Sequence, residues 1–98
     1  MITNVVPSAL LGSVGEVVSN TVTTATVVDG GSVLMCSAAP AGSDEASVLA
    51  SANTTAHTAN FLAVASTAFV EMGRFAGALG AVSAGYEVVD DANGAQFI

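Results

Sequence analysis

The sequence AAPAGSDE at residues 38–45 is the one clear break in an otherwise apolar chain with helical patterns. Pro40 and Gly42 stand two residues apart, and both residue types favour turns over helix interiors. Ser43 is the predicted N-cap of a second helix, with Asp44 and Glu45 in its first turn, where negative charge is favourable. The break therefore predicts two helices, at about 8–37 and 43–92, joined by a turn at 38–42 and followed by a tail at 93–98.

After the break, apolar residues recur at steps of three, four and seven, which is the spacing of a helix with a covered face. One stripe contains Val48, Ala52, Ala59, Leu62, Phe69 and Met72, and a second contains Phe61, Ala65, Ala68, Phe75, Leu79 and Val82. Two stripes indicate two covered faces, of which one can pack on the first helix while the other needs a different neighbour. Asn93-Gly94 is the predicted stop signal of this helix.

The segment before the break has two interpretations. Pro7 suits the first turn of a helix, and apolar residues then recur every four positions from Leu10 to Val22. Against this, residues 21–28 are rich in β-branched Thr and Val and run into Asp29-Gly30, which is the signal of a β-hairpin. These residues alone leave helix and hairpin equally favoured over 20–36. In a helix, Gly30-Gly31 would be the weak point, because each Gly costs about 1 kcal/mol relative to Ala.

The composition points to a single domain with too much apolar surface for its size. Hydrophobic residues form 52% of the 98 residues and charged residues only 9%, which excludes ordinary disorder and is unusual for a small soluble monomer. A chain this short cannot bury so much apolar surface by itself. The composition therefore predicts that a partner covers part of it.

The charge is strongly negative, with a formal net charge of −7 from one Arg, no Lys and eight acidic residues. Such a charge repels phosphate, so binding to nucleic acid or to an anionic membrane surface is not expected. The N-terminus lacks the basic region of a signal peptide, and no apolar run is long enough to predict a transmembrane helix.

No arrangement of residues predicts catalysis, cofactor binding or metal binding. Cys36 and His57 are the single Cys and the single His, and neither stands at the spacing of a nucleophile–base pair or of a metal site. The glycines match no phosphate-binding motif. Arg74, the only cationic side chain, is placed to pair with Glu71 three residues earlier.

The predicted second helix ends in the acidic stretch YEVVDD, residues 86–91. Tyr86 and Asp90 stand four residues apart and share one helix face. Carboxylates near a helix C-terminus are unfavourable, by about 0.3–1 kcal/mol each when exposed. Acids in this position suggest that something outside the chain recognises them.

The turn PAGSDEAS at residues 40–47, the long Ala-rich helix after it and the Tyr86-xxx-Asp90 pattern at its end resemble the PE proteins of mycobacteria and their relatives. The resemblance covers nearly the whole chain and is greatest to the short PE proteins encoded with ESX (type VII) secretion systems. The chain departs from the family at Pro7-Ser8, where the name motif has Pro-Glu. This departure bears on the first helix more than on the C-terminal pattern.

The resemblance implies an all-α fold, an antiparallel two-helix hairpin that forms half of a four-helix bundle with a PPE protein, and so favours a helix over 20–36. It implies a non-enzymatic protein that the ESX secretion ATPase exports, with Tyr86 and Asp90 as its secretion signal and an EspG chaperone acting through the PPE partner. It places the protein in the cytoplasm before export and outside the cell or at its envelope afterwards. The expected partner interface comprises Leu10, Val14, Val18, Leu62, Phe69, Met72, Phe75 and Leu79. Two alternatives are a self-assembling helical protein and an envelope-associated one.

Overall fold

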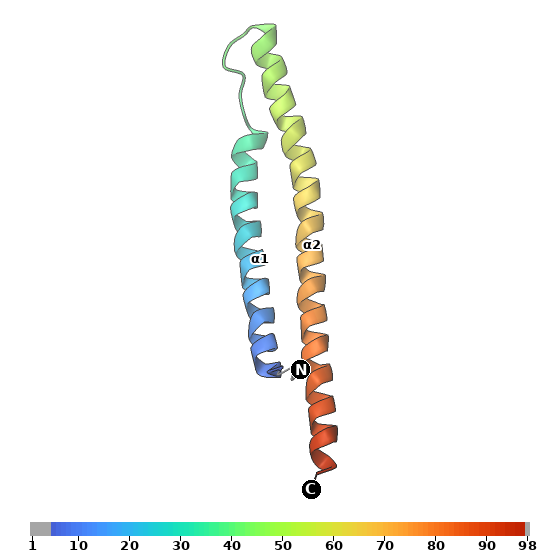
Figure 1. Ribbon diagram of the computed structural model, residues 1–98. Coiled ribbons are helices and arrows are strands. Elements are labelled where there is room, and N and C mark those ends of the chain that lie inside the picture. The colour runs from blue at the N-terminus through green and yellow to red at the C-terminus, as the bar shows by residue number, and fades with distance from the viewer. Residues whose placement is uncertain (1–4, 98) are drawn as a thin grey trace. The chain divides into compact units, whose positions relative to one another are not determined.

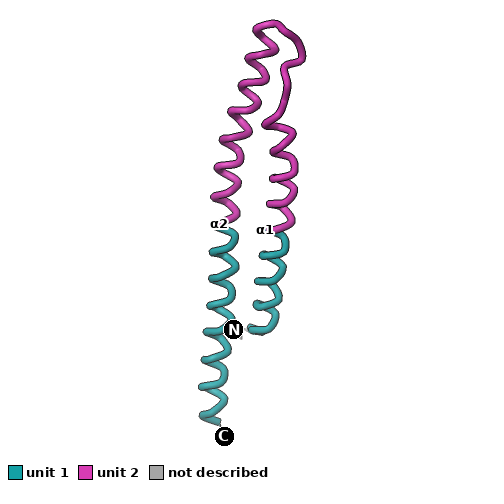
Figure 2. The backbone as a smooth tube through the Cα atoms, turned by 180° about the vertical axis from the view of Figure 1, so that it is seen from behind, with its two compact units in different colours: residues 1–21, 71–98 teal, residues 22–70 magenta. Residues whose placement is uncertain are grey.

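The computed structural model describes residues 5–97, and over these residues the chain is all-helical, with two α-helices and no strand (Figure 1). The helices are α1 (Pro7–Cys36) and α2 (Glu45–Ala95). The predicted all-α class is therefore confirmed. The chain divides into two compact units (Figure 2): unit 1 combines Met1–Thr21 with Glu71–Ile98, and unit 2 is Val22–Val70. Each unit contains a segment of α1 and a segment of α2.

Helix α1 is continuous through the stretch that resembles a β-hairpin. Its first residue is Pro7, and the Val6 carbonyl accepts the first amide hydrogen bonds, from Ala9 at 3.0 Å and Leu10 at 3.2 Å. In the Thr-rich part, hydroxyls bond to carbonyls four residues earlier, as Thr26 Oγ1 does to Val22 O at 2.9 Å. This bond satisfies the hydroxyl inside the helix. No glycine among the described residues has a positive φ, so Gly30-Gly31 is helical and not a turn.

The N-cap of α2 lies one residue later than predicted, at Asp44 and not at Ser43, and the helix begins at Glu45. Asp44 Oδ2 accepts a hydrogen bond of 3.0 Å from the Ser47 amide, and Oδ1 accepts one of 2.7 Å from Ser47 Oγ. A carboxylate at Asp44 reaches the third helical residue, which is the geometry of an N-cap. These hydrogen bonds, above all the one from Ser47 Oγ, lower the pKa of Asp44.

The end of α2 lies beyond the predicted stop, because the helix passes through Asn93-Gly94 to Ala95. Gly94 does not adopt the left-handed conformation of a glycine cap. The helix ends instead in tighter bonds, from the Gln96 amide to Asn93 O and from the Phe97 amide to Gly94 O, each 3.1 Å long.

In unit 1 the two helix segments meet along a narrow seam. Ser83 on α2 is buried, and its Oγ donates a hydrogen bond of 2.8 Å to the carbonyl oxygen of Pro7 on α1. Ala76 is buried seven residues earlier, on the same face of α2. Most half-buried residues of the α1 segment recur at steps of three and four, the spacing of a helix–helix seam: Pro7, Leu10, Val14, Val17 and Thr21, with Ser13 half-buried beside them.

In unit 2 a similar seam combines hydroxyl and apolar side chains. Ser51 Oγ donates a hydrogen bond of 2.6 Å to Ala38 O, which ties the connection between the helices to α2. Thr58 is buried and donates to Thr54 O at 2.8 Å. Only Ala76, Thr58 and Ser83 are fully buried among the described residues, so the core of both units is thin and made of small side chains.

Candidate functional site

The C-terminal part of α2 extends beyond the point where α1 begins. Ser83 bonds to Pro7, the first residue of α1, and α2 then continues to Ala95. Tyr86 and Asp90 follow Ser83 at steps of three and four. They therefore lie on the same face of α2 as Ser83, which bonds to α1. Tyr86 is 45% exposed and Asp90 is exposed. The two residues predicted to act together therefore lie on one accessible face of unit 1.

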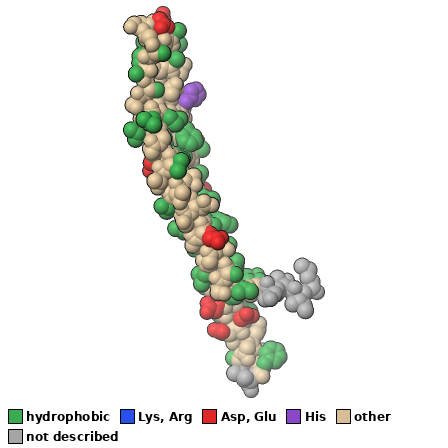
Figure 3. Space-filling model, turned by 90° about the vertical axis from the view of Figure 1, so that its left-hand side faces the viewer, with side chains coloured by type: hydrophobic (Ala, Val, Ile, Leu, Met, Phe, Trp, Pro, Cys, Tyr) green, Lys and Arg blue, Asp and Glu red, His purple; other side chains and the backbone are tan. Residues whose placement is uncertain are grey.

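Three carboxylates, Glu87, Asp90 and Asp91, surround this face and are all exposed. Figure 3 shows acidic side chains gathered toward this end of α2. Within the described part of the chain none of them has a hydrogen-bond or ion-pair partner, because Arg74 pairs with Glu71 at 2.7 Å. Since α2 continues to Ala95, the acids lie before its last turn, where the unfavourable helix-end effect is weaker than the sequence suggested. The result is an uncompensated negative patch beside an aromatic ring.

An apolar stripe of α2 in unit 1 ends at the same place. Met72, Phe75, Val82, Tyr86 and Val89 recur at steps of three, seven, four and three, so they share one face, and all five are exposed. We call these five residues the outer stripe. The stripe predicted from the sequence contained Phe75 and Val82 but ended there, and Met72 was assigned to the other stripe. The continuation through Tyr86 to Val89 was not predicted. Tyr86 thus belongs both to the acidic end and to an uncovered apolar face.

The residues of the expected partner interface divide into two groups. Val18, Met72 and Phe75 are exposed, whereas Leu10, Val14, Leu62, Phe69 and Leu79 are half-buried. Leu62 and Phe69 line a pocket together with residues of α1, so they face the chain's own first helix. Other apolar residues are also exposed but were not named in the expected interface, although Phe61 and Val82 belong to the predicted second stripe: Leu11, Val22, Val33, Leu34, Phe61, Val64 and Val82.

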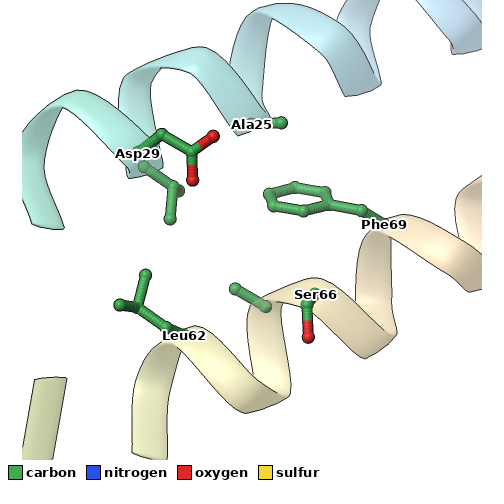
Figure 4. A pocket seen from close by; sticks show the side chains of 7 residues that line it. Ala25, Asp29, Leu62, Ser66 and Phe69 are labelled. Atoms are coloured by element: carbon green, nitrogen blue, oxygen red, sulfur yellow. The ribbon is translucent and has the colours of Figure 1, made fainter. Parts of the chain in front are cut away.

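The pocket lies within unit 2 and has a volume of about 410 Å³ (Figure 4). Its lining residues are Ala25, Val28 and Asp29 of α1 and Leu62, Ala65, Ser66 and Phe69 of α2. Sequence reasoning treated Asp29 only as part of a turn signal and missed the pocket. The helical spacing of residues 25, 28 and 29 is the signal that could have found it, once α1 was known to be continuous.

The described part of the chain has few other residues that could act in catalysis or metal binding. Cys36 and His57 are exposed, and no group of three or more His, Cys, Asp or Glu residues is placed to hold a metal ion there. By length and composition, α2 is able to cross a membrane, which the sequence did not suggest because no single uninterrupted apolar run is long enough. A helix covered by a protein partner has the same composition.

Comparison with known protein families matches residues 3–93 to the PE family. No curated protein and no solved structure matches the chain.

Proposed function

The chain belongs to the PE family, and we propose that it is a non-enzymatic PE protein that pairs with a PPE protein and is exported by an ESX secretion system.

The main observation in favour of a partner is the large solvent-exposed surface of the chain. The chain exposes 7127 Å², whereas a compact protein of its mass exposes about 5,000 Å². The excess, roughly 2,000 Å², compares with the area that one protein loses in a large, stable interface. Much of the exposed surface is apolar, including Phe61, Phe75 and Leu34, and burying apolar surface is the main favourable term in association.

A PPE helical pair is the partner that fits this surface. In the proposed complex, α1 and α2 form an antiparallel hairpin, and the partner hairpin completes a four-helix bundle over the exposed faces. The outer stripe of α2 from Met72 to Val82, before Tyr86, has the three- and seven-residue spacing that such a bundle requires. The half-buried members of the expected interface, such as Leu62, pack between α1 and α2. The exposed members Val18, Met72 and Phe75 contact the partner.

The end of α2 is the proposed secretion signal. Tyr86 supplies an aromatic anchor and Asp90 a carboxylate one turn later on the same face, and the ESX ATPase recognises the pair. The EspG chaperone binds the PPE partner and leaves this end of α2 accessible. The complex is cytoplasmic before export and lies outside the cell or at its envelope afterwards.

The test is a secretion assay in a host with an ESX system, on Tyr86→Ala and Asp90→Ala. Both variants should remain bound to the PPE protein but fail to leave the cell, because the residues lie beyond the seam with α1. Asp91→Ala is the matched control, since it removes a neighbouring exposed charge from a different face and should be exported normally. Normal export of the first two variants, with the complex intact, would show that Tyr86 and Asp90 are not the signal.

The composition of α2 also favours a second candidate, a protein that associates with membrane or envelope after export. Fractionation of the cells after export distinguishes the two candidates. A membrane- or envelope-associated protein should be found in the envelope fraction, whereas a soluble complex should be found in the medium.

A further inference from the structure

The pocket of unit 2 combines an apolar interior with one charged group at its edge. Val28, Ala65, Leu62 and Phe69 contribute apolar side chains, and Asp29 contributes a carboxylate. In Figure 4 the side chains of Asp29 on α1 and Phe69 on α2 are directed into the same opening. Such a pocket suits a group that is apolar along its length and positively charged at its end.

The chain itself has no cation for Asp29. Its composition includes a single Lys or Arg, and that residue, Arg74, pairs with Glu71 at 2.7 Å. Asp29 is exposed; its backbone carbonyl accepts a hydrogen bond of 2.7 Å from Ser32 Oγ, but its carboxylate has no ion-pair or hydrogen-bond partner within the described part of the chain. Its carboxylate loses water when a neighbouring protein covers this surface, and that loss is unfavourable unless the neighbour supplies a positive charge.

The surface beside Asp29 is open to a close neighbour. At Gly30, the next residue, an added Cβ would meet nothing within 4 Å. The absence of a side chain there allows another backbone to approach closely. Gly30 does not line the pocket, but its lack of a side chain leaves room for a neighbouring chain on the surface of α1 next to Asp29.

We infer that this pocket receives the side chain of a lysine or arginine from the PPE protein. The aliphatic part of that side chain packs on Leu62, Val28 and Ala65, and its charged end bonds to Asp29 beside the ring of Phe69, which also attracts cations. This inference rests on the proposed pairing and adds a charge requirement to it: the partner presents a basic residue at this pocket.

The experiment measures the affinity of the purified PPE partner for the full chain and for Asp29→Asn, which keeps the shape of the side chain and removes its charge. We expect Asp29→Asn to weaken binding by about ten-fold at low ionic strength, and Asp29→Arg to weaken it further. Glu16→Gln is the matched control, because Glu16 is an exposed acid of α1 outside the pocket and should change the affinity by less than about two-fold. Added NaCl should weaken the wild-type complex more steeply than the Asp29→Asn complex.

The outcomes separate this inference from the proposed function. If the wild-type chain binds no PPE protein, the proposed pairing fails and this inference fails with it. If the wild-type chain binds, but Asp29→Asn and Glu16→Gln bind equally well with the same salt dependence, the pairing stands and the basic residue at the pocket is refuted. A cation contact at Asp29 is supported only by a selective loss in the Asp29 variants.

Discussion

At the scale of single residues, short polar side chains connect the parts of this apolar protein. Asp44 caps α2 through Ser47, Ser51 holds the carbonyl of Ala38, and Ser83 holds the carbonyl of Pro7. The bond to the Ser47 amide satisfies one of the N–H groups that lack partners at the start of a helix, and the bond to Pro7 O satisfies the buried hydroxyl of Ser83. No buried side-chain polar atom of the described residues lacks a hydrogen bond. The bonds of Asp44 and Ser83 lie at the first turns of α2 and α1, where they help to position the start of each helix.

The cap at Asp44 predicts a pH dependence of stability. Hydrogen bonds from Ser47 lower the pKa of Asp44 in the folded state below its ordinary value of 3.8. The contribution of Asp44 is therefore fully present above that value and is lost as the pH falls through the lower folded pKa. Asp44→Ala should lower the melting temperature at about pH 7 and have a smaller effect below about pH 3.

Circular dichroism during heating measures this difference. Asp91→Ala, at the other end of α2, is the control for the loss of a carboxylate that has no hydrogen bond in the described part of the chain. An effect of Asp44→Ala that is equally large at both pH values would contradict a role for the ionised carboxylate.

At the scale of elements, α1 shows how helix and strand propensities compete. Its Thr- and Val-rich stretch favours β-structure, yet Thr21 and Thr26 bond to carbonyls of the preceding turn, at 2.7 and 2.9 Å. Ala25 and Val28 of the same stretch are half-buried and line the pocket together with α2 residues. Packing of one helix face and satisfied hydroxyls together outweigh the modest propensity differences, which are at most about 0.7 kcal/mol per residue for these residue types.

The glycines of α1 predict a substitution that stabilises the helix. Gly30 lies inside α1 with no positive φ, and an added Cβ would meet nothing within 4 Å. Gly30→Ala should therefore raise the free energy of unfolding by about 0.5–1 kcal/mol, because Ala loses less backbone freedom on folding. Urea unfolding under identical conditions measures the change.

Gly42→Ala is the matched control for this substitution. At Gly42 a Cβ would lie 2.8 Å from Asp44 Oδ1 and disturb the cap, so it should give no such gain. A loss of stability in Gly30→Ala would indicate that α1 is not helical at this position.

At the scale of the whole molecule, stability depends on covering surface that the chain leaves open. The fully buried residues of its described part are an alanine, a threonine and a serine, which together bury little apolar area. Conformational entropy opposes folding along the full length of both helices. A thin core and long helices therefore require additional burial, which a protein partner supplies.

This argument predicts the behaviour of the chain on its own. Purified without a partner, it should aggregate or associate with itself, and co-expression with the PPE protein should yield a soluble heterodimer. Size-exclusion chromatography with light scattering distinguishes the cases. A well-folded monomer would contradict the need for a partner, and a soluble, defined homo-oligomer would favour a self-assembling protein instead.

The sequence by itself determined the break after residue 37, the Asp- and Glu-rich start of α2, the excess of apolar surface and the joint placement of Tyr86 and Asp90. These features follow from local interactions and from composition, which do not depend on distant parts of the chain. The residues of 20–36 left helix and hairpin balanced, because their local preferences conflict. The family resemblance favoured a helix over this stretch, and the structure has one. Only the tertiary structure decided that Leu62 and Phe69 face α1 while Phe75 and Val82 remain exposed, and that Asp29 opens onto a pocket. Apolar residues occur around most of each helix, so spacing offers several possible seams, and only the position of the neighbouring helix selects one of them.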